Sequence, residues 1–203
     1  MRAVLVRSLS PDLSGVELAE MPSPVLEEGQ VLVKVRAASL NYPDLLMTQG
    51  AYQFKPELPF VSGLEMVGEV AEAPPDSAFT VGDRVMGGAK TGAFADYIAL
   101  PERSLRAIPH GLDFPAAAAM GAAYHTAYVA LVELGGLTEG QTVLVHGASG
   151  GVGLAACDLA RALGAKVIAA SHREDKLAAL EQIAKPDAAI LNTGRFRDQV
   201  AEL

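Results

Sequence analysis

Six consecutive small or β-branched residues have the types and spacing needed to hold the phosphates of a dinucleotide. Their sequence, ASGGVG, matches the fingerprint G-x-G-x-x-G/A with alanine in place of the first glycine; the residues are Ala148, Ser149, Gly150, Gly151, Val152 and Gly153. The missing side chains let a phosphate approach the backbone, and the unpaired amides of a following helix would bind it. The alternative is a glycine-rich turn that joins a strand to a helix and binds nothing.

The residues around this run predict a βαβ unit of about 30 residues. Residues 142–146 form a short apolar strand, residues 154–163 have helical spacing, and residues 166–170 form a second strand after Gly164, a typical residue just beyond a helix. A helix over residues 175–182, a strand over 188–191 and the start of a helix at 195 continue the alternation. This order favours a doubly wound parallel sheet.

The end of the second predicted strand bears on which dinucleotide would bind. An acidic residue there accepts hydrogen bonds from a free ribose 2′-hydroxyl and repels a 2′-phosphate. Ser171 stands at that position, and Arg173 and Lys176 follow it with positive charge. These residues favour NADP(H) over NAD(H). Against this, Glu174 and Asp175 are close by, and the two cations could simply be solvated at a helix start.

The first half of the chain has a different pattern. Residues 1–110 show short apolar segments separated by Gly, Pro and Asp, which is typical of a small β-barrel or sandwich. The strands are expected at residues 3–6, 16–19, 31–37, 66–71, 84–86 and 94–100, with one helical turn at 43–48. A helix is expected over residues 116–134, with a break near Gly121. We therefore expect two domains, residues 1–112 and 113–203.

Composition excludes several classes of protein. Half of the 203 residues are apolar, which is ample for a core, and no apolar run is long enough for a membrane span or a signal peptide. The net charge of −8 argues against a nucleic-acid backbone as the main partner. The single cysteine, Cys157, lies among apolar helix positions and is expected to fill space in the core. We expect a cytoplasmic globular protein that binds neither nucleic acid nor membrane.

The predicted parallel sheet is incomplete. Three strands in the order 3-2-1 leave the strand at residues 142–146, which precedes the phosphate turn, on an open edge, whereas this strand is central in a doubly wound sheet. An exposed apolar edge also favours aggregation. The expectation is therefore a fragment or truncated form of a longer protein.

The whole chain resembles the medium-chain dehydrogenase/reductase superfamily, and within it the zinc-independent quinone oxidoreductase, or zeta-crystallin-like, branch. Seven segments occur in family order: MRAVLV, AASLNYPDLLMTQGAYQ, PFVSGLEMVGEV, VGDRVMG, GAFADYIALP, AYHTAYVAL and VLVHGASGGVG. The resemblance implies an α/β plus β protein with a GroES-like β-barrel catalytic domain followed by an incomplete Rossmann domain. It implies reduction of a quinone or an α,β-unsaturated carbonyl with NADP(H), and a homodimeric or homotetrameric full-length parent.

The same resemblance implies three residues at the reaction site. Asn41 is similar to the family asparagine that faces the nicotinamide, Thr126 to a threonine that contacts it, and Tyr52 to an aromatic residue at the substrate cleft. Each also has an ordinary structural interpretation. Asn41 could cap a helix, Thr126 could donate to a carbonyl within its own helix, and Tyr52 could pack on the barrel. Glu65 lies in a family motif too, although it could be a structural carboxylate paired with an arginine.

Catalytic zinc in the alcohol dehydrogenase branch needs Cys and His ligands where this sequence has Asn41, Leu64 and Ala122. None of the three can bind zinc as that site requires, so no metal is expected. No general acid is assignable, and Tyr52 or water could deliver the proton. The alternative to an enzyme is a non-catalytic NADP-binding or interaction module of the same family.

Overall fold

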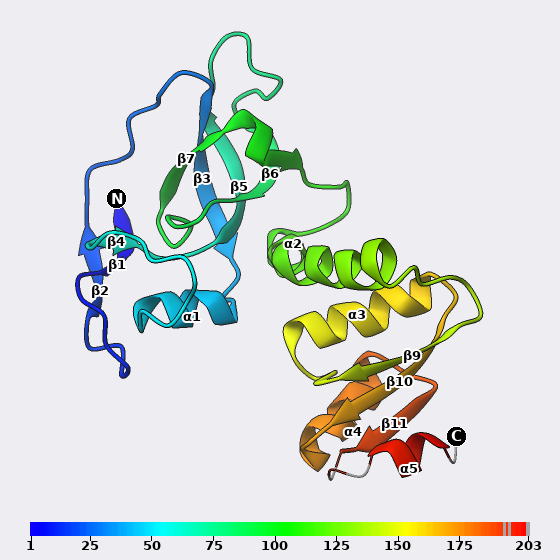
Figure 1. Ribbon diagram of the computed structural model, residues 1–203. Coiled ribbons are helices and arrows are strands. Elements are labelled where there is room, and N and C mark those ends of the chain that lie inside the picture. Colours follow the sequence, from blue (N-terminus) through cyan, green and yellow to red (C-terminus); the bar gives the residue numbers. More distant parts are fainter. Residues whose placement is uncertain (193, 195, 202–203) are drawn as a thin grey trace. The chain divides into compact units, whose positions relative to one another are not determined.

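The computed structural model describes residues 1–192, 194 and 196–201. The chain divides into two compact units, Met1–Gly121 and Ala122–Leu203. The first consists mainly of strands and the second of alternating strands and helices (Figure 1). The division falls inside helix α2 (Phe114–Tyr128), whereas the sequence placed the boundary before this helix, after residue 112.

Two antiparallel sheets make up most of the first unit. The larger has the strand order β7-β3-β5-β6-β8, and the smaller has the order β2-β1-β4. Their bounds are β1 Arg2–Val6, β2 Val16–Glu20, β3 Gln30–Ala38, β4 Phe60–Val61, β5 Glu65–Glu72, β6 Arg84–Gly88, β7 Tyr97–Pro101 and β8 Leu105–Ala107. The β-rich architecture predicted for this half is confirmed. Strands β4 and β8, of two and three residues, were not predicted because such short segments show no periodicity.

Two short helices complete the first unit. Helix α1 (Tyr42–Thr48) corresponds to the helical turn expected at residues 43–48, with Asn41 as its N-cap and a proline in its first turn. The 3₁₀ turn η1 (Glu102–Ser104) joins β7 to β8. The residue that precedes and caps α1 is therefore one of those assigned to the reaction site.

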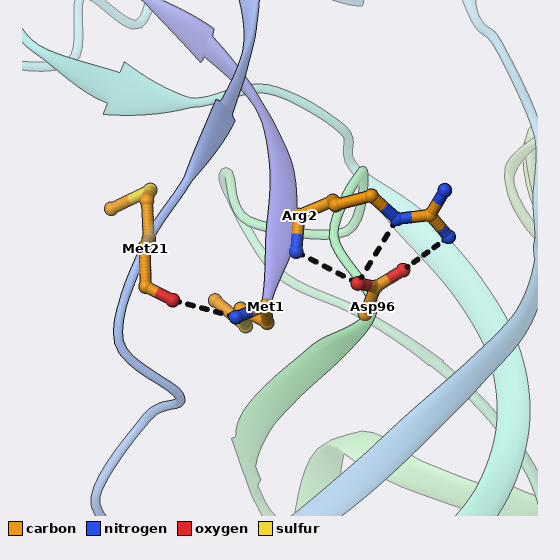
Figure 2. Close-up of polar contacts among 4 residues, drawn as sticks. All are labelled: Met1, Arg2, Met21 and Asp96. Atoms are coloured by element: carbon orange, nitrogen blue, oxygen red, sulfur yellow. Dashed lines mark hydrogen bonds and ion pairs between the residues drawn. The ribbon is translucent and has the colours of Figure 1, made fainter.

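Polar contacts hold the N-terminus in place (Figure 2). The Met1 ammonium group donates a hydrogen bond to the Met21 carbonyl at 2.7 Å. The backbone amide of Arg2 donates to Asp96 Oδ2 at 2.7 Å, and the guanidinium group of Arg2 forms an ion pair with Asp96 Oδ1 at 3.1 Å. These hydrogen bonds from Arg2 lower the pKa of Asp96 from its usual value. They fasten β1, in the smaller sheet, to the segment that precedes β7 in the larger one.

The second unit contains a parallel sheet with the strand order β11-β10-β9. Its strands and helices are β9 Thr142–His146, α3 Gly151–Ala162, β10 Lys166–Ser171, α4 Glu174–Ile183, β11 Ala188–Leu191 and α5 Phe196–Ala201. This confirms the predicted order 3-2-1. Within the residues that the structure describes, β9 is an edge strand, and the turn assigned to phosphate binding follows it directly.

Each face of this parallel sheet has its own core. On one face, Val145, Val167 and Ala169 pack with residues of α3 and α4, and Cys157 is fully buried among them, as predicted. On the other face, Ile168, Ala170 and Ile190 pack together, with a partly buried valine of α5 against them. The two successive crossover helices thus share one face, which anchors the start of α3 at the end of β9.

Helix α2 departs from the sequence-based expectation at two points. It continues through Gly121 without a break, and it changes after Tyr128 into a π-helix, η2 (Val129–Leu134). A hydrogen bond from Gly135 N to Ala130 O at 3.0 Å has the five-residue spacing of that helix type. No local sequence signal distinguishes a π-helix from an α-helix here.

None of the helices among the described residues has the length and apolar character needed to span a membrane.

Candidate functional site

The run assigned to phosphate binding forms the turn between β9 and α3. After His146, Gly147 adopts a positive φ of 63°, and the Gly150 amide donates to the Gly147 carbonyl at 2.9 Å. Gly150 is the N-cap of α3, and the bond from Leu154 N to Gly150 O, at 2.8 Å, belongs to the first helical turn. The amides of residues 151–153 precede Leu154, at the position where a helix has donors without an intrahelical acceptor.

The glycines of this turn differ in what surrounds them. A Cβ atom at Gly153 would lie 2.7 Å from Ala148 Cα, so a hydrogen at this position lets α3 pack against the turn. A Cβ at Gly150 would have Gly147 O as its nearest neighbour, at 3.4 Å, and one at Gly151 would meet nothing within 4 Å. The protein itself therefore has room for a Cβ atom at Gly150 and at Gly151. Both residues are exposed.

The other members of the run have separate positions. Ala148 is fully buried, and its amide donates to Ala170 O at 3.1 Å, which ties the turn to β10. Ser149 is half-buried, and Val152 is exposed on the first turn of α3. Alanine is therefore well accommodated at the first position of the fingerprint.

Ser171, Arg173 and Lys176 lie where β10 ends and α4 begins. Ser171 is buried, and its Oγ accepts a hydrogen bond from Arg173 N at 3.3 Å. The Arg173 guanidinium group donates to both carboxylate oxygens of Asp175, at 3.0 and 2.6 Å. These hydrogen bonds raise the pKa of Arg173 and lower that of Asp175. Arg173 is thus exposed but already paired, so a phosphate would compete with Asp175 for it.

Thr126 is an exposed residue near the C-terminal end of α2, shortly before the π-helix. Two positions earlier, the Tyr124 hydroxyl donates to Asp158 Oδ2 of α3 at 2.7 Å. Partial burial, together with this carboxylate, raises the pKa of Tyr124 to about 12, so the phenol keeps its proton at neutral pH. This pair holds the segment that carries Thr126 against α3. Sequence reasoning missed it, because the partners lie 34 positions apart.

Asn41 lies in a polar cluster of the first unit. Its side-chain Nδ2 donates to Glu65 Oε1 at 2.7 Å, and the Ser39 hydroxyl donates to the same oxygen. Its backbone amide donates to Asp44 Oδ2 at 2.8 Å. Asp44 is only 1% exposed, and burial raises the pKa of its carboxyl group. The sequence singled out Asn41 and Glu65 separately and did not predict their direct contact.

Tyr52 is half-buried and packs against a small apolar cluster. The buried members of this cluster are Val6, Met47 and Phe60. Phe54 packs on it too, and the ammonium group of Lys90 lies over the Phe54 ring, 4.9 Å from its centroid. The sequence reasoning did not single out this cation beside the aromatic residues.

Asn41, Leu64 and Ala122, the residues expected in place of zinc ligands, are surrounded by protein groups of other kinds. The Asn41 amide is bonded to Glu65, Leu64 packs against the apolar cluster that includes Tyr52, and Ala122 is half-buried. Among the residues that the structure describes, no three His, Cys, Asp or Glu side chains are grouped to hold a metal ion.

Cys157 should resist thiol reagents in the folded protein. Burial raises its pKa to about 11, so near neutral pH only a very small fraction is thiolate. We expect its reaction with an aromatic disulfide reagent at about pH 8 to be roughly 100-fold slower than in the guanidinium-unfolded chain. Released chromophore, followed by absorbance, measures both rates. A fast stoichiometric reaction of the native protein would show that the thiol is accessible.

Comparisons with known proteins extend this description. Residues 27–110 match the alcohol dehydrogenase GroES-like domain. Over its whole length, the chain is 40% identical to the quinone oxidoreductase-like protein 2 homolog of Nematostella vectensis, of which it covers 55%. The chain spans about half the length of the curated relatives it matches.

Many solved structures are similar to this chain, and two of them differ in the cofactor that their names give. The quinone oxidoreductase of Thermus thermophilus, also solved in complex with NADPH, has a TM-score of 0.81 and 36% identity over 93% of this chain and 59% of that one. An NAD-dependent alcohol dehydrogenase has a TM-score of 0.91 and 30% identity over all of this chain and 67% of that one. Both likenesses extend across the β-rich unit and the parallel sheet.

Proposed function

Because this chain belongs to the medium-chain dehydrogenase/reductase superfamily, among the relatives of its quinone oxidoreductases, we propose that it serves an NADPH-dependent reduction of quinones or α,β-unsaturated carbonyls without zinc. The main support for this proposal is the structure of the turn at Gly150 and Gly151. At the start of α3, Gly150 and Gly151 are exposed. A Cβ atom at Gly150 would meet no protein atom closer than 3.4 Å, and one at Gly151 would meet none within 4 Å. A phosphate placed in that space would meet backbone amides and the positive end of the helix dipole.

The proposal assigns the cofactor to named groups of the second unit. The amides of Gly151, Val152 and Gly153, with the Ser149 hydroxyl, would bind the pyrophosphate. Ala148 would keep the turn in place through its bond to β10. Ser171, Arg173 and Lys176 would hold the 2′-phosphate, since an acidic residue is missing from the end of β10.

The reaction is proposed to depend on three further residues. When bound, the reduced nicotinamide supplies a hydride, and the protein contributes position and electrostatics. Asn41 and Thr126 are assigned to the nicotinamide end, and Tyr52 to the substrate. Asn41 stands where a zinc ligand would be, and its amide is engaged by Glu65, which supports chemistry without a metal. Either the Tyr52 phenol or water would donate the proton.

Arg173→Ala should weaken the binding of NADPH selectively. The guanidinium group would give a charged hydrogen bond to the 2′-phosphate, partly offset by the loss of its pair with Asp175. We expect about a tenfold rise in the Kd for NADPH, with the Kd for NADH unchanged. Fluorescence titration of both nucleotides measures this, and Arg103→Ala, at another exposed arginine, is the matched control. An equal loss for both nucleotides would mean that Arg173 does not recognise the phosphate.

The proposed reaction is tested by turnover. NADPH oxidation should be observed with phenanthrenequinone or with a simple enone, faster than NADH oxidation at equal concentration. Prior dialysis against a strong chelator should leave the rate unchanged if no zinc takes part. Absence of turnover with both acceptors, in a protein that binds NADPH, would favour the non-catalytic alternative.

A further inference from the structure

We infer that Glu65 is a positioning residue that fixes the orientation of the Asn41 amide, so that Asn41 offers its carbonyl oxygen, a hydrogen-bond acceptor, to the ligand. The inference rests on the proposed function, since it takes Asn41 to lie at the nicotinamide end. It concerns contacts within the first unit only.

The chemistry of the cluster decides which way the amide faces. Asn41 Nδ2 lies 2.7 Å from Glu65 Oε1, and a carboxylate only accepts hydrogen bonds. The amide nitrogen must therefore face Glu65, which removes the usual ambiguity between the two ends of an asparagine side chain. Ser39 lies beside the same nitrogen, with its Oγ at 3.3 Å and its carbonyl oxygen at 3.5 Å. The amide nitrogen is thus surrounded by protein acceptors, with the Glu65 carboxylate oxygen nearest to it.

The backbone of Asn41 is held as well. Its amide donates to the buried Asp44 Oδ2 at 2.8 Å, in the first turn of α1. The Asn41 side chain also faces the Asp44 backbone amide in a capping arrangement that lacks full hydrogen-bond geometry. Since a carbonyl oxygen has two lone pairs, Asn41 Oδ1 retains the capacity to accept from a ligand.

Gly121 makes the position of Glu65 possible. A Cβ atom at Gly121 would overlap Glu65 Oε2, the end of a flexible side chain, so a larger residue at this position in α2 would require the carboxylate to move. We expect that movement to disturb the hydrogen bond between Asn41 Nδ2 and Glu65 Oε1. Gly121 thus provides a way to displace Glu65 without altering Asn41 or Glu65 chemically.

The orientation limits what Asn41 can do. An acceptor at Oδ1 suits a donor on the ligand, such as a ribose hydroxyl or a carboxamide N–H at the nicotinamide end. It cannot stabilise the negative charge that develops on a substrate oxygen, because that task needs a donor. Asn41 would therefore hold the cofactor, and another group would serve the substrate oxygen.

The test exchanges the donor and acceptor of the pair. Asn41→Asp places two carboxylates face to face, and we expect about a tenfold rise in the Kd for NADPH. In the double variant Asn41→Asp with Glu65→Gln, the glutamine amide can donate to one oxygen of the new carboxylate, and the other oxygen can again be held toward the ligand as an acceptor. We expect its Kd to return to within about threefold of wild type. Gly121→Ala should also raise the Kd, by displacing Glu65.

Two controls separate the possible failures. Adenosine 2′,5′-bisphosphate lacks the nicotinamide end and should bind equally to every variant. If the wild-type protein binds neither NADPH nor adenosine 2′,5′-bisphosphate, the proposed function fails. The inference can still be tested by NMR, because Glu65→Gln should strongly shift the resonances of the Asn41 side-chain amide. The inference is overturned if those resonances do not move. It is also overturned if the nucleotides bind and the double variant is as weak as Asn41→Asp.

Discussion

Gly150→Val should remove most nucleotide binding while the chain stays folded. The backbone at Gly150 has φ −83° and ψ 167°, a conformation that valine adopts readily, and the nearest atom to its Cβ would be 3.4 Å away. The side chain would occupy the space proposed for the pyrophosphate. Loss of about 2 kcal/mol of charge-assisted hydrogen bonding corresponds to roughly a 30-fold rise in the Kd for NADPH.

A graded pair of variants makes this result specific. Gly150→Ala should weaken binding less than Gly150→Val, because the obstruction grows with the side chain. Both free energies of unfolding, from urea titration, should stay within about 0.5 kcal/mol of wild type. If Gly150→Val binds NADPH as tightly as wild type, the pyrophosphate does not lie at this turn.

Gly153→Ala, in contrast, should lower the stability of the second unit, because the added methyl group would point into the protein and not into the proposed phosphate site. Alanine is the better helix former by about 1 kcal/mol, but its Cβ would lie 2.7 Å from Ala148 Cα, a backbone atom that cannot rotate away. Forcing α3 off the turn should cost about 2 kcal/mol or more, net of the gain in helix propensity. We expect the second unit to unfold at lower urea concentration.

Gly151→Ala is the matched control for this prediction. It lies in the same helical turn, and its added methyl group would meet nothing within 4 Å. Its stability should equal or slightly exceed that of wild type. If Gly153→Ala is as stable as Gly151→Ala, the tight packing of α3 against the turn is not required.

Local signals predicted the second unit well. The β-branched run before Gly147, the glycines after it and the apolar spacing of α3 all act over neighbouring residues, and the structure places β9, α3 and β10 there. The order of the parallel strands also followed, because crossovers of this length bring consecutive strands side by side. The helical turn expected at residues 43–48 likewise corresponds to α1, which begins one residue earlier, after its N-cap Asn41.

The contacts of the candidate site were less predictable, because they join distant positions. Asn41 and Glu65 are separated by 24 positions and meet through the pairing of β3 with β5, which no local pattern reveals. The pair of Tyr124 and Asp158 depends likewise on the packing of two helices. Gly121 was interpreted as a helix breaker, whereas its missing side chain accommodates the Glu65 carboxylate. Steric reasons of this kind become visible only with the fold.

The most direct test of the account is a titration of this chain with NADPH, followed by the fluorescence of the nucleotide. We expect NADPH to bind saturably in the micromolar range and adenosine 2′,5′-bisphosphate to compete with it. NADH should bind clearly more weakly. The same titration of Gly150→Val should show binding reduced by roughly 30-fold. Absence of saturable binding by the folded wild-type chain would contradict the assignment of the turn between β9 and α3 to a dinucleotide.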